Sequence, residues 1–185
     1  AQAEYPESLT STADGTLYTG SITQGVVFKI APGGASEVFI PAPADGPKNS
    51  LGVYADEANG TLWVCYAAGG ASRGEGRMAA VLRLYNIAEG AQKGPFPFPA
   101  VASFCNDIAT TADGTAYAAD TIGAKVYKAK GGEITEWSAD PLLAGVDGLS
   151  FGPNGALYVN SVTANKLLRI DVNADGSAGA VTELK

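Results

Sequence analysis

Short runs of apolar and polar residues recur along the chain, without a sustained helical periodicity. A turn dipeptide precedes each of four β-rich runs, and the four dipeptides are Asp14-Gly15, Asn59-Gly60, Asp113-Gly114 and Asn154-Gly155. The runs that follow them are 16–19, 61–64, 115–118 and 156–159. Because Asp-Gly and Asn-Gly tolerate positive φ and form tight hairpins, each dipeptide predicts a strand, a turn and a second strand.

A basic residue within an apolar run marks a third strand in each unit, and the four bases are Lys29, Arg83, Lys128 and Arg169. Each base lies 13 residues after the position that follows the turn, except in the second unit, where the spacing is 22. We interpret the four bases as the solvent-facing side of an outer strand. A fourth β-rich run completes each unit, at 37–40, 95–98, 134–137 and 180–184.

Four antiparallel strands per unit predict an all-β fold, a β-propeller built of four-stranded antiparallel blades. We expect one propeller domain over residues 1–185, with blades at about 5–41, 49–99, 104–138 and 145–185. Four blades form either a closed four-bladed propeller or an open arc of a larger ring. An arc would expose strand edges and apolar blade faces at both ends, which predicts either a homo-oligomer through the terminal blades or a missing partner.

The amino-acid composition limits the partners, catalytic mechanisms and metal ligands that this chain can use. The chain is 46% apolar, its net charge is −7 and it contains no histidine. The negative charge makes nucleic acids and anionic membranes poor partners, and no apolar run reaches the roughly 18 residues of a membrane helix. Without histidine, Ser-His-Asp and Cys-His mechanisms and His-ligated zinc are excluded. Any metal should therefore take oxygen ligands, and Ca²⁺ is the natural candidate.

The first strand of each blade lines the central channel of a propeller. Counting back from each turn, with two extra residues allowed in the second blade, brings four polar residues to one equivalent position: Glu7, Ser50, Asn106 and Asp147. Carboxylate and amide oxygens around a cavity are the ligands of a hard divalent cation, so we predict a metal site at one end of the channel. The alternative is a polar lining of a water-filled channel. Strand alternation points Asp107 away from Asn106, so we leave Asp107 out of the site.

The nine extra residues of the second unit fall in a Gly-rich loop at 67–79, which carries Arg73, Glu75 and Arg77. By topology this loop hangs over the same channel mouth, so Arg73 and Arg77, together with Ser50, are candidates for contacting a small-molecule substrate. The alternative is a surface insertion without such a role.

Three further motifs have two interpretations each. Cys65 and Cys105 should lie at one face of neighbouring blades, as a disulfide or as two reduced thiols. The opening Ala1-Gln2-Ala3 has the spacing of a signal-peptidase site, which would indicate an exported, periplasmic or secreted protein, or it is an ordinary frayed terminus. The segment 171–176 imitates the start of an EF-hand loop, but its twelfth position is Thr182, so we expect a plain turn.

Three short motifs, 6–9, 104–107 and 145–149, each precede a turn and a strand. They resemble the regucalcin/gluconolactonase (senescence marker protein) family, whose members are six-bladed propellers with a divalent metal, usually calcium, in the channel. Many members hydrolyse sugar lactones or related esters. The resemblance implies that Glu7 is a first-blade metal ligand and that Asn106 lies near metal and substrate. It places Asp147 where the family usually has a metal-binding Asn.

The family takes its catalytic Asp from the fifth blade, which has no counterpart in these four units. The resemblance therefore implies that the chain is truncated relative to its relatives, that Asp147 acts as the catalytic base, or that catalysis has been lost. We expect a calcium-dependent hydrolase of small lactones or related esters, with Asp147 activating water. The alternatives are a non-catalytic ligand- or protein-binding propeller, and a propeller fragment that completes its ring by oligomerisation.

Overall fold

Four antiparallel sheets make up the computed structural model, which describes residues 5–68 and 78–185. The first sheet contains β1 (Pro6–Ser11), β2 (Leu17–Ser21), β3 (Val27–Ile30) and β4 (Ser36–Ile40). The second contains β5 (Asn49–Asp56), β6 (Thr61–Ala67), β7 (Val81–Asn86) and β8 (Gln92–Pro97). The third contains β9 (Cys105–Thr110), β10 (Ala116–Asp120), β11 (Lys125–Lys130) and β12 (Glu133–Ala139). The fourth contains β13 (Val146–Phe151), β14 (Leu157–Ser161), β15 (Lys166–Val172) and β16 (Ala178–Leu184).

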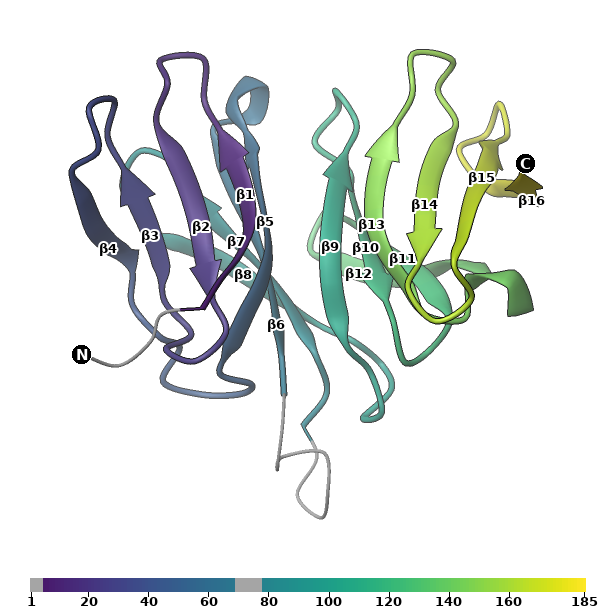
Figure 1. Ribbon diagram of the computed structural model, residues 1–185, viewed down its shortest axis with the longest axis horizontal. Coiled ribbons are helices and arrows are strands. Elements are labelled where there is room, and N and C mark those ends of the chain that lie inside the picture. The colour runs from purple at the N-terminus through teal and green to yellow at the C-terminus, as the bar shows by residue number, and fades with distance from the viewer. Residues whose placement is uncertain (1–4, 69–77) are drawn as a thin grey trace.

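Each sheet is a meander whose strands pair in sequence order, so the four predicted four-stranded antiparallel blades are confirmed. Short 3₁₀ helices precede two strands, η1 (Glu57–Asn59) before β6 and η3 (Pro141–Leu143) before β13. The blades stand around a common axis, with the β1–β2 and β13–β14 hairpin turns at the top of Figure 1. The first strands β1, β5, β9 and β13 pack against one another in series. Their starts therefore lie at the opposite end from these turns.

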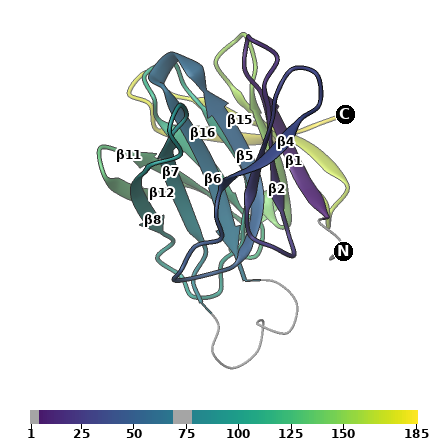
Figure 2. The same cartoon turned by 90° about the vertical axis from the view of Figure 1, so that its left-hand side faces the viewer.

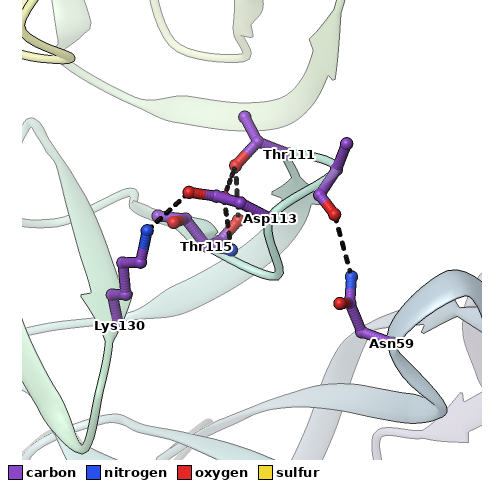
Figure 3. Close-up of polar contacts among 6 residues, drawn as sticks. Asn59, Thr111, Asp113, Thr115 and Lys130 are labelled. Atoms are coloured by element: carbon purple, nitrogen blue, oxygen red, sulfur yellow. Dashed lines mark hydrogen bonds and ion pairs between the residues drawn. The ribbon is translucent and has the colours of Figure 1, made fainter.

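The hairpin turn between β9 and β10 shows why the Asp-Gly dipeptide specifies this geometry. Asp113 Oδ1 accepts hydrogen bonds from the Thr111 hydroxyl (2.7 Å) and from the Thr115 N–H (3.1 Å), and Gly114 has φ +76° (Figure 3). The Asn59 amide of the second blade donates to the Ala112 carbonyl (3.4 Å). The Asp113 carboxylate thus closes its own turn, as Asx side chains commonly do. The same turn contacts the second blade through Ala112.

Three buried apolar clusters join the blades in chain order. One lies between the first and second blades, around Tyr18, Val27 and Leu62. The others lie between the second and third blades and between the third and fourth. Among the described residues, no fourth cluster joins the last blade to the first. The four blades thus form an arc in which the first and last blades each pack on one neighbour. In Figure 2, β1 and β4 lie on the side opposite to β8 and β12.

Arg83 corrects the prediction that all four strand bases face solvent. It pairs with Val64, whereas Lys29, Lys128 and Arg169 pair with an aromatic residue of the second strand, so Leu84 is the true equivalent. Arg83 is 4% exposed and donates to Asp45 Oδ1 and to Gln92 Oε1, both at 2.9 Å. Arg83 ties the segment between the first two blades to the second blade.

Two open alternatives are also resolved. Cys65 of β6 and Cys105 of β9 form a disulfide, with Cα atoms 5.2 Å apart, so the second and third blades are covalently linked. The EF-like segment is a plain hairpin turn between β15 and β16, in which the Asn173 N–H donates to the Ser177 carbonyl (3.0 Å).

Within the described residues, no helix has the length and apolar character needed to span a membrane.

Candidate acidic site at the start of the inner strands

A β-bulge interrupts each inner strand at the same place in the repeat. The register shifts lie between Glu7 and Leu9, Ser50 and Val53, Cys105 and Ile108, and Val146 and Leu149. In each case two consecutive residues oppose one residue of the second strand, and the pairs are Glu7/Ser8, Leu51/Gly52, Asn106/Asp107 and Asp147/Gly148. Bulges of this kind re-aim side chains and often lie next to functional sites.

The residues at three of these bulges line one cavity. Its volume is about 180 Å³, and it is bordered by Glu7, Ser8, Asn106, Asp107, Asp147 and Gly148. The predicted convergence of Glu7, Asn106 and Asp147 on one end of the inner strands is therefore present in the structure. The cavity combines three carboxyl groups with one amide, and no basic residue is among its lining residues.

Asp107 lies at this cavity, so its exclusion by strand alternation is wrong. Alternation assumes a regular strand, but the bulge places two successive residues against one partner, Ala119. The Leu149 N–H donates to Asp107 Oδ2 (2.8 Å), which joins the third blade to the fourth. Ser8 holds the same bulge position in the first blade, and its hydroxyl accepts from the Val53 N–H (3.1 Å). The second residue of the bulge therefore connects neighbouring blades.

Ser50 lies outside the cavity, and its assignment to the position of Glu7 is wrong by one residue. Leu51 is the equivalent, because β5 runs on to Asp56 before the short helix η1, which lengthens the strand by one residue rather than two. Ser50 is fully buried. Its hydroxyl accepts from the Ser21 N–H (2.7 Å) and donates to the Val26 carbonyl (2.8 Å). Ser50 therefore fastens the second blade to the first.

At its bulge the second blade thus has Leu51 and Gly52, where the other three blades have a polar side chain. Arg73 and Arg77, the other predicted substrate contacts, lie outside the described residues, and so does Glu75. Sequence reasoning missed Ser8, Asp107 and Gly148 as cavity residues. The signal that marks them is the pair itself, a polar first residue followed by a small or acidic second residue at the same distance from the turn.

Glu7 is the most perturbed acid of the cavity. Burial raises its pKa to about 7, and the negative charges of Asp107 and Asp147 act in the same direction. Its Oε2 atom is buried and has no hydrogen-bond partner among the described residues. A partly buried carboxylate beside two others is costly unless a proton or a cation compensates it. The raised pKa of Glu7 reflects repulsion among the carboxylates, which marks this cavity as a candidate functional site.

The other two acids are perturbed in the same direction. Burial raises the pKa of Asp107, although hydrogen bonds from the Leu149 and Ile108 N–H groups oppose the shift. Burial also raises the pKa of Asp147, opposed by a hydrogen bond with the Asn160 side chain. The Asn106 amide donates to Thr121 Oγ1 (3.1 Å), which fixes the nitrogen end of that amide.

The donor chemistry fits a hard cation, since every polar group lining the cavity from a bulge is an oxygen-bearing side chain. In the part of the chain that the structure describes, however, no group of three or more Asp, Glu, Cys or His side chains is arranged to hold a metal ion. One carboxylate oxygen of Asp107 is engaged by the Leu149 N–H. The oxygen ligands that we consider for a cation are therefore the Glu7 carboxylate, the Asp147 carboxylate and the amide oxygen of Asn106.

Solved structures share this architecture. A catalytically inactive virginiamycin B lyase from Staphylococcus aureus, bound to quinupristin, is similar over 100% of this chain and 57% of its own, with a TM-score of 0.76 and 18% identity. A protein described as "putative gluconolactonase" is similar over 98% and 63%, with a TM-score of 0.74 and 16% identity. A protein of unknown function from Bacteroides caccae is similar over 98% and 62%, with a TM-score of 0.69 and 14% identity.

These likenesses establish the fold: the chain is an all-β protein whose four blades match part of larger propellers. It spans less than two thirds of the length of the solved structures that it matches. No protein-family model matches the sequence, and no curated protein matches it by sequence similarity.

Proposed function

We propose that the acidic cavity binds a divalent cation of the calcium type and that these blades belong to a hydrolase of small lactones or related esters. The observation that carries the proposal is the half-buried Glu7 carboxyl group, whose Oε2 atom is buried, lacks a partner among the described residues and faces the charges of Asp107 and Asp147. A cation would relieve this repulsion without protonating the acids.

The cation would be held by the Glu7 and Asp147 carboxylates and the Asn106 amide oxygen, with water in further positions. When bound, it supplies Lewis-acid polarisation of a carbonyl group. Asp147 is the candidate base that would take a proton from the attacking water, because its pKa is raised by burial and it lines the cavity. Asp107, already anchored to Leu149, would keep the two last blades in register beside the reacting groups.

The likeness to a structure described as "putative gluconolactonase" supports this reaction class. The substrate would be a small molecule, because the described cavity measures about 180 Å³. Substrate contacts by Arg73 and Arg77 stay predictions. We also propose an exported location, periplasmic or secreted, since the Cys65–Cys105 disulfide is typical of proteins that fold in an oxidising compartment.

A second candidate function is a non-catalytic binding propeller. It is favoured by the finding that no three acidic or other ligating side chains in the described ranges are arranged to hold a metal. Asp107 and Ser8 also serve as connections between blades. In this version the cavity would bind a ligand without hydrolysing it, and propellers host many such functions.

Calcium titration calorimetry tests the cation site without a substrate. We expect Glu7→Gln to weaken Ca²⁺ binding by about tenfold or more, because affinity follows the number of charged ligands. Glu133→Gln is the matched control, since Glu133 is exposed at the start of the outer strand β12 and does not line the cavity. Equal Ca²⁺ affinity in wild type and Glu7→Gln would remove the cation from the proposal.

Turnover is measured separately, with a panel of small lactones and esters at saturating Ca²⁺. We expect hydrolysis by the wild type and its loss in Asp147→Asn, with thermal unfolding of the apo variant little changed. Calcium binding without any hydrolysis would favour the binding propeller instead. Absence of both would end the hydrolase version and leave a binding propeller whose ligand is not calcium.

A further inference from the structure

The residue that faces the bulge from the second strand is different in the fourth blade. In each blade one residue of the second strand lies opposite both residues of the bulge, and the four are Gly20, Cys65, Ala119 and Asn160. Cys65 is part of the disulfide, and glycine and alanine have no polar side chain. Asn160 therefore brings an amide group to a position where the other blades have a small or disulfide-bonded residue.

The Asn160 amide contacts both residues of the bulge that it faces. Its Oδ1 atom accepts a hydrogen bond from the Gly148 N–H (2.6 Å). The Asn160 side chain also hydrogen-bonds the Asp147 carboxyl group, and this bond lowers the pKa of Asp147 against the effect of burial. Because a carboxylate can only accept, the amide nitrogen is the donor. One amide therefore bridges two consecutive residues of the bulge.

Gly148 leaves room for this bridge. A Cβ atom at position 148 would lie 2.6 Å from Asn160 Oδ1, which is closer than side chains normally approach. The next N–H along the strand, that of Leu149, donates to Asp107 of the third blade (2.8 Å). The two N–H groups that follow Asp147 thus have side-chain acceptors in different blades, and the backbone that carries Asp147 is held from both sides.

We propose that Asn160 is a positioning residue, which holds the Asp147 carboxylate at the acidic cavity by bridging the two residues of the fourth bulge. Asn160 is not among the residues that line the cavity, whereas Asp147 and Gly148 are. Hydrogen-bonding partners behind a ligating side chain commonly fix its orientation and tune its strength as a ligand. The consequence for cation binding and hydrolysis rests on the proposed function, whereas the bridge itself does not.

Hydrogen exchange measured by NMR tests the bridge without cation or substrate. We expect Asn160→Ala to speed exchange of the Gly148 N–H by about tenfold, because its acceptor is removed. Asn154→Ala is the matched control, at the exposed hairpin turn of the same blade. Asn154 accepts from the Ala156 N–H (3.3 Å) and donates to the Tyr158 hydroxyl (3.1 Å). The control thus loses a comparable pair of hydrogen bonds away from the bulge and should leave exchange at Gly148 unchanged.

The side-chain amide protons of Asn160 report on the other half of the bridge. In Asp147→Ala their NMR signals should shift and their exchange should speed up, because the carboxylate that accepts from them is gone. The amide signals of Asn154 should not move. Unchanged exchange at Gly148 in Asn160→Ala, or unchanged Asn160 amide signals in Asp147→Ala, would overturn the proposal whatever the cavity binds.

Calcium calorimetry and lactone turnover then measure the effect on the site. We expect Asn160→Ala to weaken Ca²⁺ binding by about threefold or more and to lower kcat by about tenfold with little change in KM. The variant keeps every group that lines the cavity but removes the support of Asp147. Gly148→Ala is a second variant, which keeps every polar group while its Cβ displaces the Asn160 amide, and it should act in the same direction. Asn154→Ala should match the wild type in both measurements.

The proposed function and the role of Asn160 fail on different results. A wild type that neither binds Ca²⁺ nor hydrolyses any lactone would end the proposed function, and the exchange data would then decide by themselves whether Asn160 holds Asp147. If Glu7→Gln weakens Ca²⁺ binding and Asn160→Ala changes neither binding nor kcat, the cation site would stand and the positioning role of Asn160 would be overturned.

Discussion

At the scale of single residues, the Glu7 carboxyl group makes the stability of the protein depend on pH. Its pKa is about 7 in the folded chain and 4.5 for an unperturbed glutamate. Between these values the folded state binds more protons than the unfolded state, so the free energy of unfolding falls as pH rises from about 4.5 to about 7. We expect this loss to be on the order of 2 kcal/mol, after a reduction for the part of Glu7 that solvent reaches.

Urea unfolding of the wild type and of Glu7→Gln across this pH range isolates the effect. Asp107 and Asp147 have raised pKa values too, so the wild type loses stability through them as well, and only the difference between the two proteins reports on Glu7. Glu7→Gln should be the more stable of the two near pH 7 and should lose that advantage near pH 4. Parallel curves at all pH values would contradict the assignment.

At the scale of elements, the turns were predictable and the bulges were not. The Asp-Gly turns are specified by neighbours in sequence, as the Asp113 carboxylate shows by bonding to Thr111 and Thr115. At two of the four bulges, the second residue accepts a hydrogen bond from the next blade, Ser8 in the first blade and Asp107 in the third. A pattern read along one strand contains no sign of those partners. For this reason the convergence of Glu7 and Asp147 could be predicted, but not that of Asp107.

Gly52 offers a test of how closely the second and third blades approach at the bulge. A Cβ atom at this position would lie 2.4 Å from the Asn106 carbonyl oxygen and 2.8 Å from Asp107 Cα, both backbone atoms that cannot move aside easily. We expect Gly52→Ala to lower the free energy of unfolding by about 2 kcal/mol, as overpacking typically does. It should also weaken the proposed Ca²⁺ binding by displacing Asn106.

Gly94→Ala is the matched control, because its Cβ would meet nothing closer than Phe96 Cε2 at 3.9 Å. Urea unfolding should show little change or a small gain for this variant, since alanine restricts the unfolded chain more than glycine does. If Gly52→Ala were as stable as Gly94→Ala, the close approach of β5 to β9 would not exist in solution.

At the scale of the whole molecule, the repeat alone predicted the number of blades and their fold class. The spacing could not settle the thiol state of Cys65 and Cys105, because pairing depends on a Cα distance that only the packing of two blades determines. The position of Arg83 likewise followed from pairing with Val64, which the irregular spacing of the second unit obscured. The features that strand patterns could not predict, the disulfide and the position of Arg83, thus depend on how blades or strands pack against one another.

The disulfide between these blades has a consequence for the stability of the arc. It joins residues 40 positions apart, so in the chain-entropy account its removal should lower the free energy of unfolding by about 4 kcal/mol. Denaturation of the wild type with and without a reductant measures this loss, and the variant with both Cys65→Ala and Cys105→Ala should match the reduced wild type and ignore the reductant. Hydrogen exchange should increase first in β6 and β9, since the other two interfaces have no covalent link. A reduced protein as stable as the oxidised one would mean that the apolar core around Trp63 and Ile108 holds the two blades together alone.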